Sequence, residues 1–77
     1  MLTGVGNEKV YLAAGFTDLR KSIDGLAAIV QISFKLDPFS ENLFVFCNKN
    51  RDRLKILRWE YNGFWLYLRR LEQGKFR

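Results

Sequence analysis

The side chains that most often carry out catalysis are scarce in this chain of 77 residues. It contains no histidine, the commonest general base, and its one cysteine, Cys47, cannot make a zinc site by itself. Ser22 and Ser40 have no base to activate them. Each aspartate is explained by its place beside a helix start, an arginine or a proline. We therefore predict no catalytic residue, no metal and no cofactor, and a protein that is not an enzyme.

The side chains that do indicate a function are Lys and Arg. The net charge is +5, but residues 1–42 hold four basic and five acidic residues, whereas residues 43–77 hold nine basic and three acidic residues. A basic surface on one side of a domain is typical of proteins that meet phosphates, although many ordinary domains also have one. The candidate nucleic-acid-binding residues are Lys49, Arg51, Arg53, Lys55, Arg58, Arg69 and Arg70.

Most of these basic residues belong to a predicted β-hairpin over residues 53–72. Asn62-Gly63 favours a two-residue type I′ turn, which would place Tyr61 opposite Phe64 and Arg58 opposite Tyr67. Side chains alternate along each strand, so the hairpin has two faces. The predicted core face carries Leu57, Trp59, Tyr61, Phe64, Leu66 and Leu68. The other face carries Leu54, Ile56, Arg58, Trp65, Tyr67, Arg69 and Leu71.

The second face of the hairpin is apolar and aromatic with guanidinium groups among the rings, which indicates a surface for a partner. Trp65, Tyr67 and Leu71 are the candidate partner-interface residues. Aromatic rings with arginines nearby also hold single-stranded nucleic acid in some sheet proteins. The pattern favours a protein interface over nucleic acid here, and Arg58 with Tyr67 can be read simply as a cross-strand cation–π pair.

The elements before the hairpin supply the rest of the predicted fold. Residues 9–13 form a short strand candidate, and Leu19, Ile23, Leu26, Val30 and Phe34 mark an amphipathic helix over about residues 17–34. The apolar run at residues 43–47 is a central strand candidate. We therefore predict a single α+β domain over residues 1–77, with one amphipathic helix packed on a small antiparallel β-meander and a flexible lead-in at residues 1–7.

The sequence also predicts where the protein works. A lone cysteine excludes an internal disulfide and suits a reducing cytosol. No run approaches the ~20 apolar residues that cross a bilayer, so we expect a cytoplasmic protein that does not contact membranes.

Several segments together resemble the small accessory protein, TnpB or Orf2-like, of IS-sixty-six-type bacterial insertion sequences. The segments, in order over nearly the whole chain, are residues 17–26 (TDLRKSIDGL), 36–40 (LDPFS), 43–48 (LFVFCN), 51–53 (RDR), 62–65 (NGFW) and 70–76 (RLEQGKF). Family members usually continue past the equivalent of Phe76-Arg77, which indicates a shortened copy or a fragment.

The resemblance implies an accessory protein of a mobile element that is encoded beside a separate transposase and assists DNA transposition. It brings no catalytic residue. The expected partners are the transposase of the same element, DNA, or a second copy of the chain in a homodimer. The alternative is an oligomerisation or scaffolding module without direct nucleic-acid contact.

Overall fold

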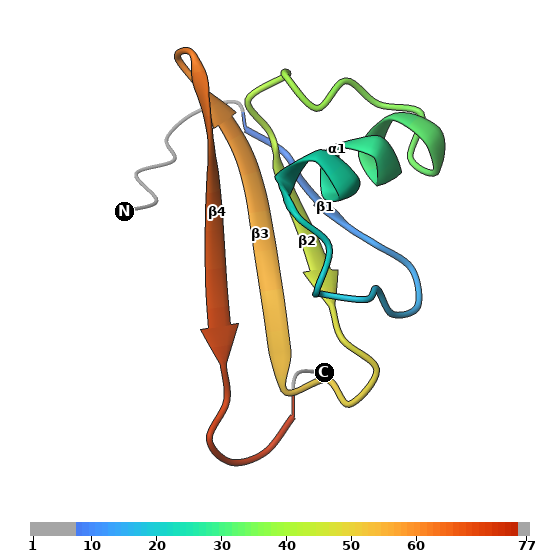
Figure 1. Ribbon diagram of the computed structural model, residues 1–77, viewed down its shortest axis with the longest axis vertical. Helices are drawn as coiled ribbons and strands as arrows, with labels where there is room; N and C mark the ends of the chain where they lie inside the picture. Colours follow the sequence, from blue (N-terminus) through green and yellow to red (C-terminus); the bar gives the residue numbers. More distant parts are fainter. Residues whose placement is uncertain (1–7, 76–77) are drawn as a thin grey trace.

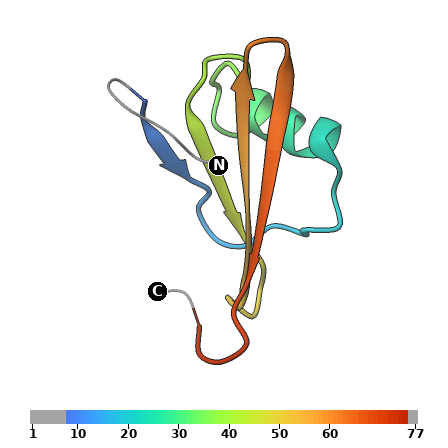
Figure 2. The same ribbon diagram turned by 90° about the vertical axis from the view of Figure 1, so that its left-hand side faces the viewer.

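The computed structural model describes residues 8–75 of the chain, so the predicted lead-in at residues 1–7 lies outside the described residues. In chain order the elements are β1 (Val10–Leu12), α1 (Ile23–Ile32), β2 (Leu43–Cys47), β3 (Arg53–Glu60) and β4 (Gly63–Arg70). The four strands make one sheet in the order β1-β2-β3-β4, and α1 lies against one of its faces (Figures 1 and 2). No helix within residues 8–75 is long and apolar enough to cross a membrane.

The sheet corrects the predicted fold class. β2, β3 and β4 pair antiparallel as expected, but β1 joins the sheet parallel to β2, with Tyr11 opposite Phe44. The sheet is therefore four-stranded and mixed, and the prediction of a helix on a purely antiparallel meander is wrong. The physical reason is the connection from β1 to β2, which carries α1 across one face and returns the chain in the starting direction.

The helix is shorter than its apolar stripe predicts, because it begins at Ile23 and not at Thr17. The backbone N–H of Thr17 donates to the carbonyl of Cys47 at 2.8 Å, which holds the chain beside β2. The Asp18 carboxylate then accepts the backbone N–H of Arg20 at 3.0 Å and makes a turn that competes with helix. After the last helical turn Lys35 adopts the left-handed conformation with φ 57°.

The core lies between α1 and the sheet, as the sequence predicts. Leu26 and Val30 of α1 are fully buried with Leu57 of β3, and Phe44 and Phe46 of β2 complete the centre. Leu19, Ile23, Phe34 and Leu66 pack around them and are partly buried. Trp59, which the sequence places on the core face, contacts a different set of aromatic side chains. Its ring lies 4.8 Å from that of Phe39 and 5.0 Å from that of Phe64 between centroids.

The hairpin forms, but its register differs from the prediction by two residues. Glu60 pairs with Gly63, so the turn contains Tyr61 and Asn62, and Tyr61 takes the left-handed φ of 61°. Gly63 has no positive φ and begins β4, so the predicted type I′ turn at Asn62-Gly63 is wrong. A shift of two residues leaves every side chain on its predicted face, because side chains alternate with a period of two. It does place Arg58 opposite Trp65, which overturns the expected pair with Tyr67.

Candidate nucleic-acid interface

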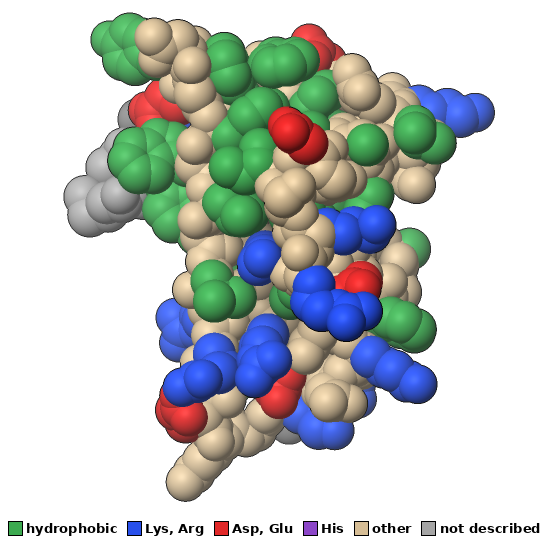
Figure 3. Space-filling view, viewed as in Figure 1, with side chains coloured by type: hydrophobic (Ala, Val, Ile, Leu, Met, Phe, Trp, Pro, Cys, Tyr) green, Lys and Arg blue, Asp and Glu red, His purple; other side chains and the backbone are tan. Residues whose placement is uncertain are grey.

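A groove of about 560 Å³ lies beside α1, between the loop that precedes the helix and the ends of β3 and β4 away from the hairpin turn. Its basic lining residues come from three separate parts of the chain and are Arg20, Lys49, Arg53, Lys55 and Arg70. In the space-filling view Lys and Arg side chains gather on this half of the face that carries α1, below an apolar region (Figure 3). We refer to this feature as the basic groove.

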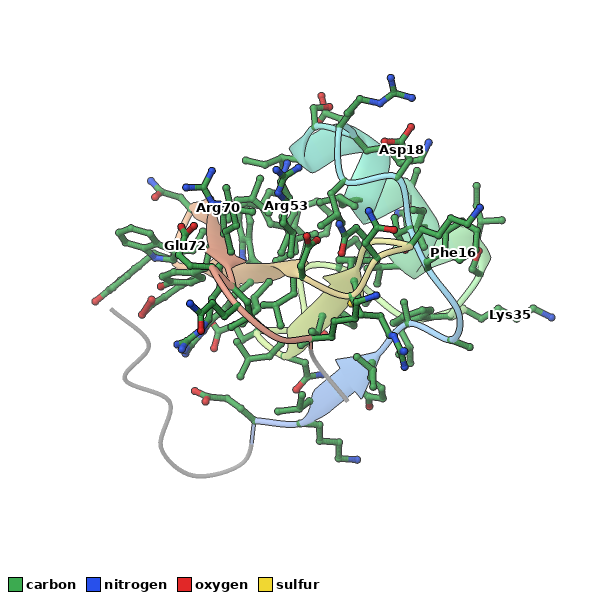
Figure 4. The ribbon with its side chains drawn as sticks, turned by 90° about the horizontal axis from the view of Figure 1, so that it is seen from below. Phe16, Asp18, Lys35, Arg53, Arg70 and Glu72 are labelled. Carbon is green, nitrogen blue, oxygen red and sulfur yellow. The ribbon has the colours of Figure 1, made fainter. Side chains whose placement is uncertain are left out.

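The centre of the basic groove is a pair of like charges. Arg53 of β3 and Arg70 of β4 are directly opposite in the register of the sheet, and both are exposed. They lie beside each other on the side of the sheet that carries α1 (Figure 4). Like charges directly opposite in neighbouring strands destabilise a sheet. Glu72 offsets one of them, since Arg70 donates to its carboxylate at 2.9 Å, and an anion in the groove would offset the other.

Hydrogen bonds hold the loop that carries Lys49 and leads into Arg53 at the start of β3. The Asn48 side-chain oxygen accepts the backbone N–H groups of Asp52 and Arg53 at 3.1 and 3.0 Å, and its amide donates to the Asp52 carboxylate at 2.7 Å. This last hydrogen bond lowers the pKa of Asp52 below its usual range. The backbone N–H of Leu71 also donates to the Asp52 carbonyl, at 2.7 Å. The loop and the end of β4 are therefore held together.

The wall near α1 carries an ion pair between neighbours in sequence. The Arg20 guanidinium donates to both oxygens of Asp18, with the closest contact at 2.9 Å. These hydrogen bonds lower the pKa of Asp18 to about 2. Asp18 is therefore ionised at neutral pH and occupies Arg20, which leaves Lys49, Arg53 and Lys55 without an ion pair among residues 8–75.

We predict that Arg20→Ala returns the pKa of Asp18 from about 2 toward the ordinary 3.8. Because the folded pKa lies below the unfolded one, the contribution of this pair to stability is complete above the ordinary pKa and is lost as the pH falls toward 2. An NMR titration of the Asp18 carboxyl carbon measures both values. An ordinary pKa in the unaltered protein would show that the pair does not persist in solution.

The groove also has an apolar component that the sequence did not identify as part of a site. Phe16, in the loop after β1, is 64% exposed, and Leu68 of β4 is 62% exposed. Both line the basic groove, and the Lys49 Nζ atom lies 5.9 Å from the centre of the Phe16 ring. Leu68 was assigned to the core face, but α1 does not reach that end of the sheet. In the sequence, the only indication of a role for Phe16 was an aromatic residue next to Gly15.

The structure separates the other predicted nucleic-acid-binding residues from the groove. Arg51 lines a different hollow with Leu12 and Leu54, and Arg69 is exposed on the face of the sheet away from α1. Arg58 is 6% exposed and donates to the Glu8 carboxylate at 2.7 Å. Of the seven candidates, the groove therefore collects Lys49, Arg53, Lys55 and Arg70.

The candidate partner-interface residues lie away from the groove. Trp65 and Tyr67 are on the face of the sheet that α1 does not cover, with their rings stacked 6.0 Å apart between centroids. Trp65 is 49% exposed, and Val10 and Leu12 of β1 are 65% and 68% exposed. Leu71 follows β4 and is half-buried. Within residues 8–75 no cluster of acidic or cysteine side chains could hold a metal ion.

Comparison with known proteins identifies related sequences. Residues 8–77 match a family model described as IS66 Orf2 like protein. Two relatives come from Sinorhizobium fredii. "Uncharacterized protein y4hO" is 38% identical over 76 residues, 99% of this chain, and "Uncharacterized protein y4jC" is 35% identical over 68 residues, 88% of this chain. The matched parts span 66% and 58% of those relatives. No solved structure matches the chain.

Proposed function

Because the chain belongs to the IS66 Orf2-like family of insertion-sequence accessory proteins, we propose that it assists DNA transposition by binding DNA phosphates in the basic groove. It does so without catalysis of its own. The observation that supports this most strongly is the opposed pair of Arg53 and Arg70, with Lys55 next along the same face of β3. A phosphate between the two guanidinium groups removes their repulsion and receives charge-assisted hydrogen bonds.

The arrangement of the groove fits a phosphate chain better than a single small anion. Lys49 lies in a loop, Arg53 and Lys55 lie two residues apart on β3, and Arg70 ends β4. Positions two apart on a strand are separated by about 6.5 Å, close to the spacing of successive phosphates in a nucleic-acid strand. Contacts of this kind position a nucleic acid and do not read its sequence.

The proposal is tested by binding of the purified protein to the terminal DNA of its own element at low ionic strength. Fluorescence anisotropy with and without the transposase separates direct binding from recruitment. We expect the protein alone to bind at micromolar concentration or tighter, with little preference for the terminal sequence. Binding that requires the transposase would contradict direct recognition through the groove.

A second surface, separate from the basic groove, supports a role in binding a protein partner. The apolar side chains Val10, Leu12 and Trp65 lie on the face of the sheet that α1 leaves open, and exposed apolar patches on small domains usually mark interaction sites. We propose that this face contacts a second copy of the chain or the transposase, with Tyr67 and Leu71 at its edge.

We predict that Trp65→Glu abolishes a concentration-dependent dimer, because the substitution buries an unpaired charge in the interface. Sedimentation equilibrium measures the change. Tyr61→Glu, which adds the same charge at the hairpin turn where Tyr61 is 91% exposed, is the control and should leave association intact. A strict monomer at high concentration would rule out the homodimer and leave the transposase as the occupant.

A further inference from the structure

We infer that the basic groove holds a single strand of DNA with its bases unstacked in preference to duplex DNA. The inference rests on the proposed binding of DNA phosphates and names the form of DNA that the groove takes. It is carried by the apolar surface inside the groove, which contact with phosphates alone does not explain.

The groove combines cationic and apolar side chains. Phe16 and Leu68 are both more than half exposed, and both line the same groove as Lys49, Arg53, Lys55 and Arg70. A duplex presents its phosphates to a protein and keeps the flat faces of its bases stacked inside the helix. It would therefore leave the Phe16 ring and the Leu68 side chain without a partner.

A single strand presents both kinds of group to such a surface. Proteins that bind it combine a positively charged groove, which follows the backbone, with aromatic rings on which bases stack. Here Phe16 belongs to the loop that forms one wall, while Arg53 and Arg70 belong to the opposite wall formed by β3 and β4 (Figure 4). A backbone that follows the strand ends would therefore turn its bases toward Phe16.

The exposure of Phe16 has no structural explanation within the core. Its ring makes no aromatic pair among the described residues, and the Lys49 Nζ atom lies 5.9 Å from its centre. Phe34, by comparison, lies within 6.2 Å of both Phe44 and Phe46 between ring centroids. Replacing Phe16 should therefore change binding without changing the fold, which makes it a clean probe.

The experiment compares a fluorescein-labelled single strand of about 12 nucleotides, within the usual site size, with a duplex of the same sequence. Anisotropy titrations in the same low-salt buffer use the full chain. We expect the single strand to bind more tightly than the duplex. Phe16→Ala should weaken single-strand binding roughly 5- to 150-fold, the loss of one stacked base, and leave duplex binding unchanged.

Three variants make the result specific to stacking. Phe16→Tyr keeps the ring and should retain the affinity, whereas Tyr61→Ala removes an exposed ring outside the groove and should have no effect. Arg53→Gln should weaken binding to both forms of DNA. Circular dichroism checks that each variant is folded.

Equal binding of single strand and duplex, or an unchanged single-strand affinity in Phe16→Ala, would overturn this inference. Salt-sensitive binding in either case would still support the proposed function. Tighter binding to a single-stranded RNA of the same sequence would overturn the assignment to DNA. No binding to either form of DNA would overturn the proposed function and this inference together.

Discussion

Replacing Leu57 with alanine is expected to remove about 2–5 kcal/mol from the free energy of unfolding. Leu57 is fully buried where α1 meets the sheet, and it touches the same core as Leu26, Val30 and Phe44. A chain of this length has a total stability of roughly 4–12 kcal/mol at the usual value per residue, so the variant should lose a large share of it. Urea unfolding followed by tryptophan fluorescence measures the loss, and Leu26→Ala should behave in the same way.

Leu68→Ala is the matched control for this prediction. Leu68 lies on the same face of the sheet but is 62% exposed in the basic groove, so its loss should change stability by only about 0.5 kcal/mol. Equal destabilisation by Leu57→Ala and Leu68→Ala would contradict the placement of α1 on the sheet.

Neutralising the groove is expected to weaken DNA binding by roughly 10- to 100-fold. The variant replaces Lys49, Arg53 and Lys55 with glutamine, which removes three cations that have no ion pair among the described residues. Exposed charge contacts contribute up to about 1 kcal/mol each, so the loss of three has an upper limit of about 3 kcal/mol, or roughly 150-fold in affinity. Anisotropy titrations at one low salt concentration measure the affinity, and circular dichroism should show an unchanged fold.

The control variant removes the same charge elsewhere. Lys35, Arg51 and Arg69 are exposed and do not line the groove, and Lys35 projects beyond the far end of α1 (Figure 4). Replacing these three with glutamine lowers the net charge equally, so a general attraction between DNA and a basic protein would weaken as much as in the groove variant. If the two variants lose the same affinity, the groove is not the binding site.

Hydrophobic periodicity predicted the parts of the fold that depend on burial. The spacing of Leu26 and Val30 identified the core stripe of α1, and alternation in the hairpin placed Leu57 and Trp65 on opposite faces. Both predictions survive errors in local detail, because a face is decided by the period of the pattern. The register of the hairpin moved by two residues without exchanging the faces.

The features that the sequence did not predict depend on competition between hydrogen bonds and on chain direction. The apolar stripe begins at Leu19, but the Asp18 turn and the bond from Thr17 to Cys47 delay the helix to Ile23. Three residues of β1 do not reveal whether the strand pairs parallel or antiparallel. That is decided by the crossing of α1 between β1 and β2.

For the candidate site, the sequence shows how many basic residues the chain has but not which of them lie together in the folded protein. Alternation alone places Arg53 and Lys55 on one face, whereas Arg51 precedes the strand in a left-handed conformation with φ 59° and lines a different hollow. Arg58 falls on the opposite face and is buried against Glu8. Phe16 joins the groove only because the loop before α1 folds back beside the sheet.

The salt dependence of binding to a short single strand of DNA tests the central claim most directly. Each phosphate that a cation neutralises releases condensed counterions, which gives a slope of about −0.7 in a plot of log affinity against log salt for single strands. Lys49 and Lys55 with one phosphate each, and Arg53 and Arg70 with one phosphate between them, predict a slope of about −2. The slope should fall to about −1 when Lys49, Arg53 and Lys55 are replaced with glutamine, because Arg70 keeps its phosphate. A slope near zero, an unchanged slope in that variant, or no association at low ionic strength would contradict the account.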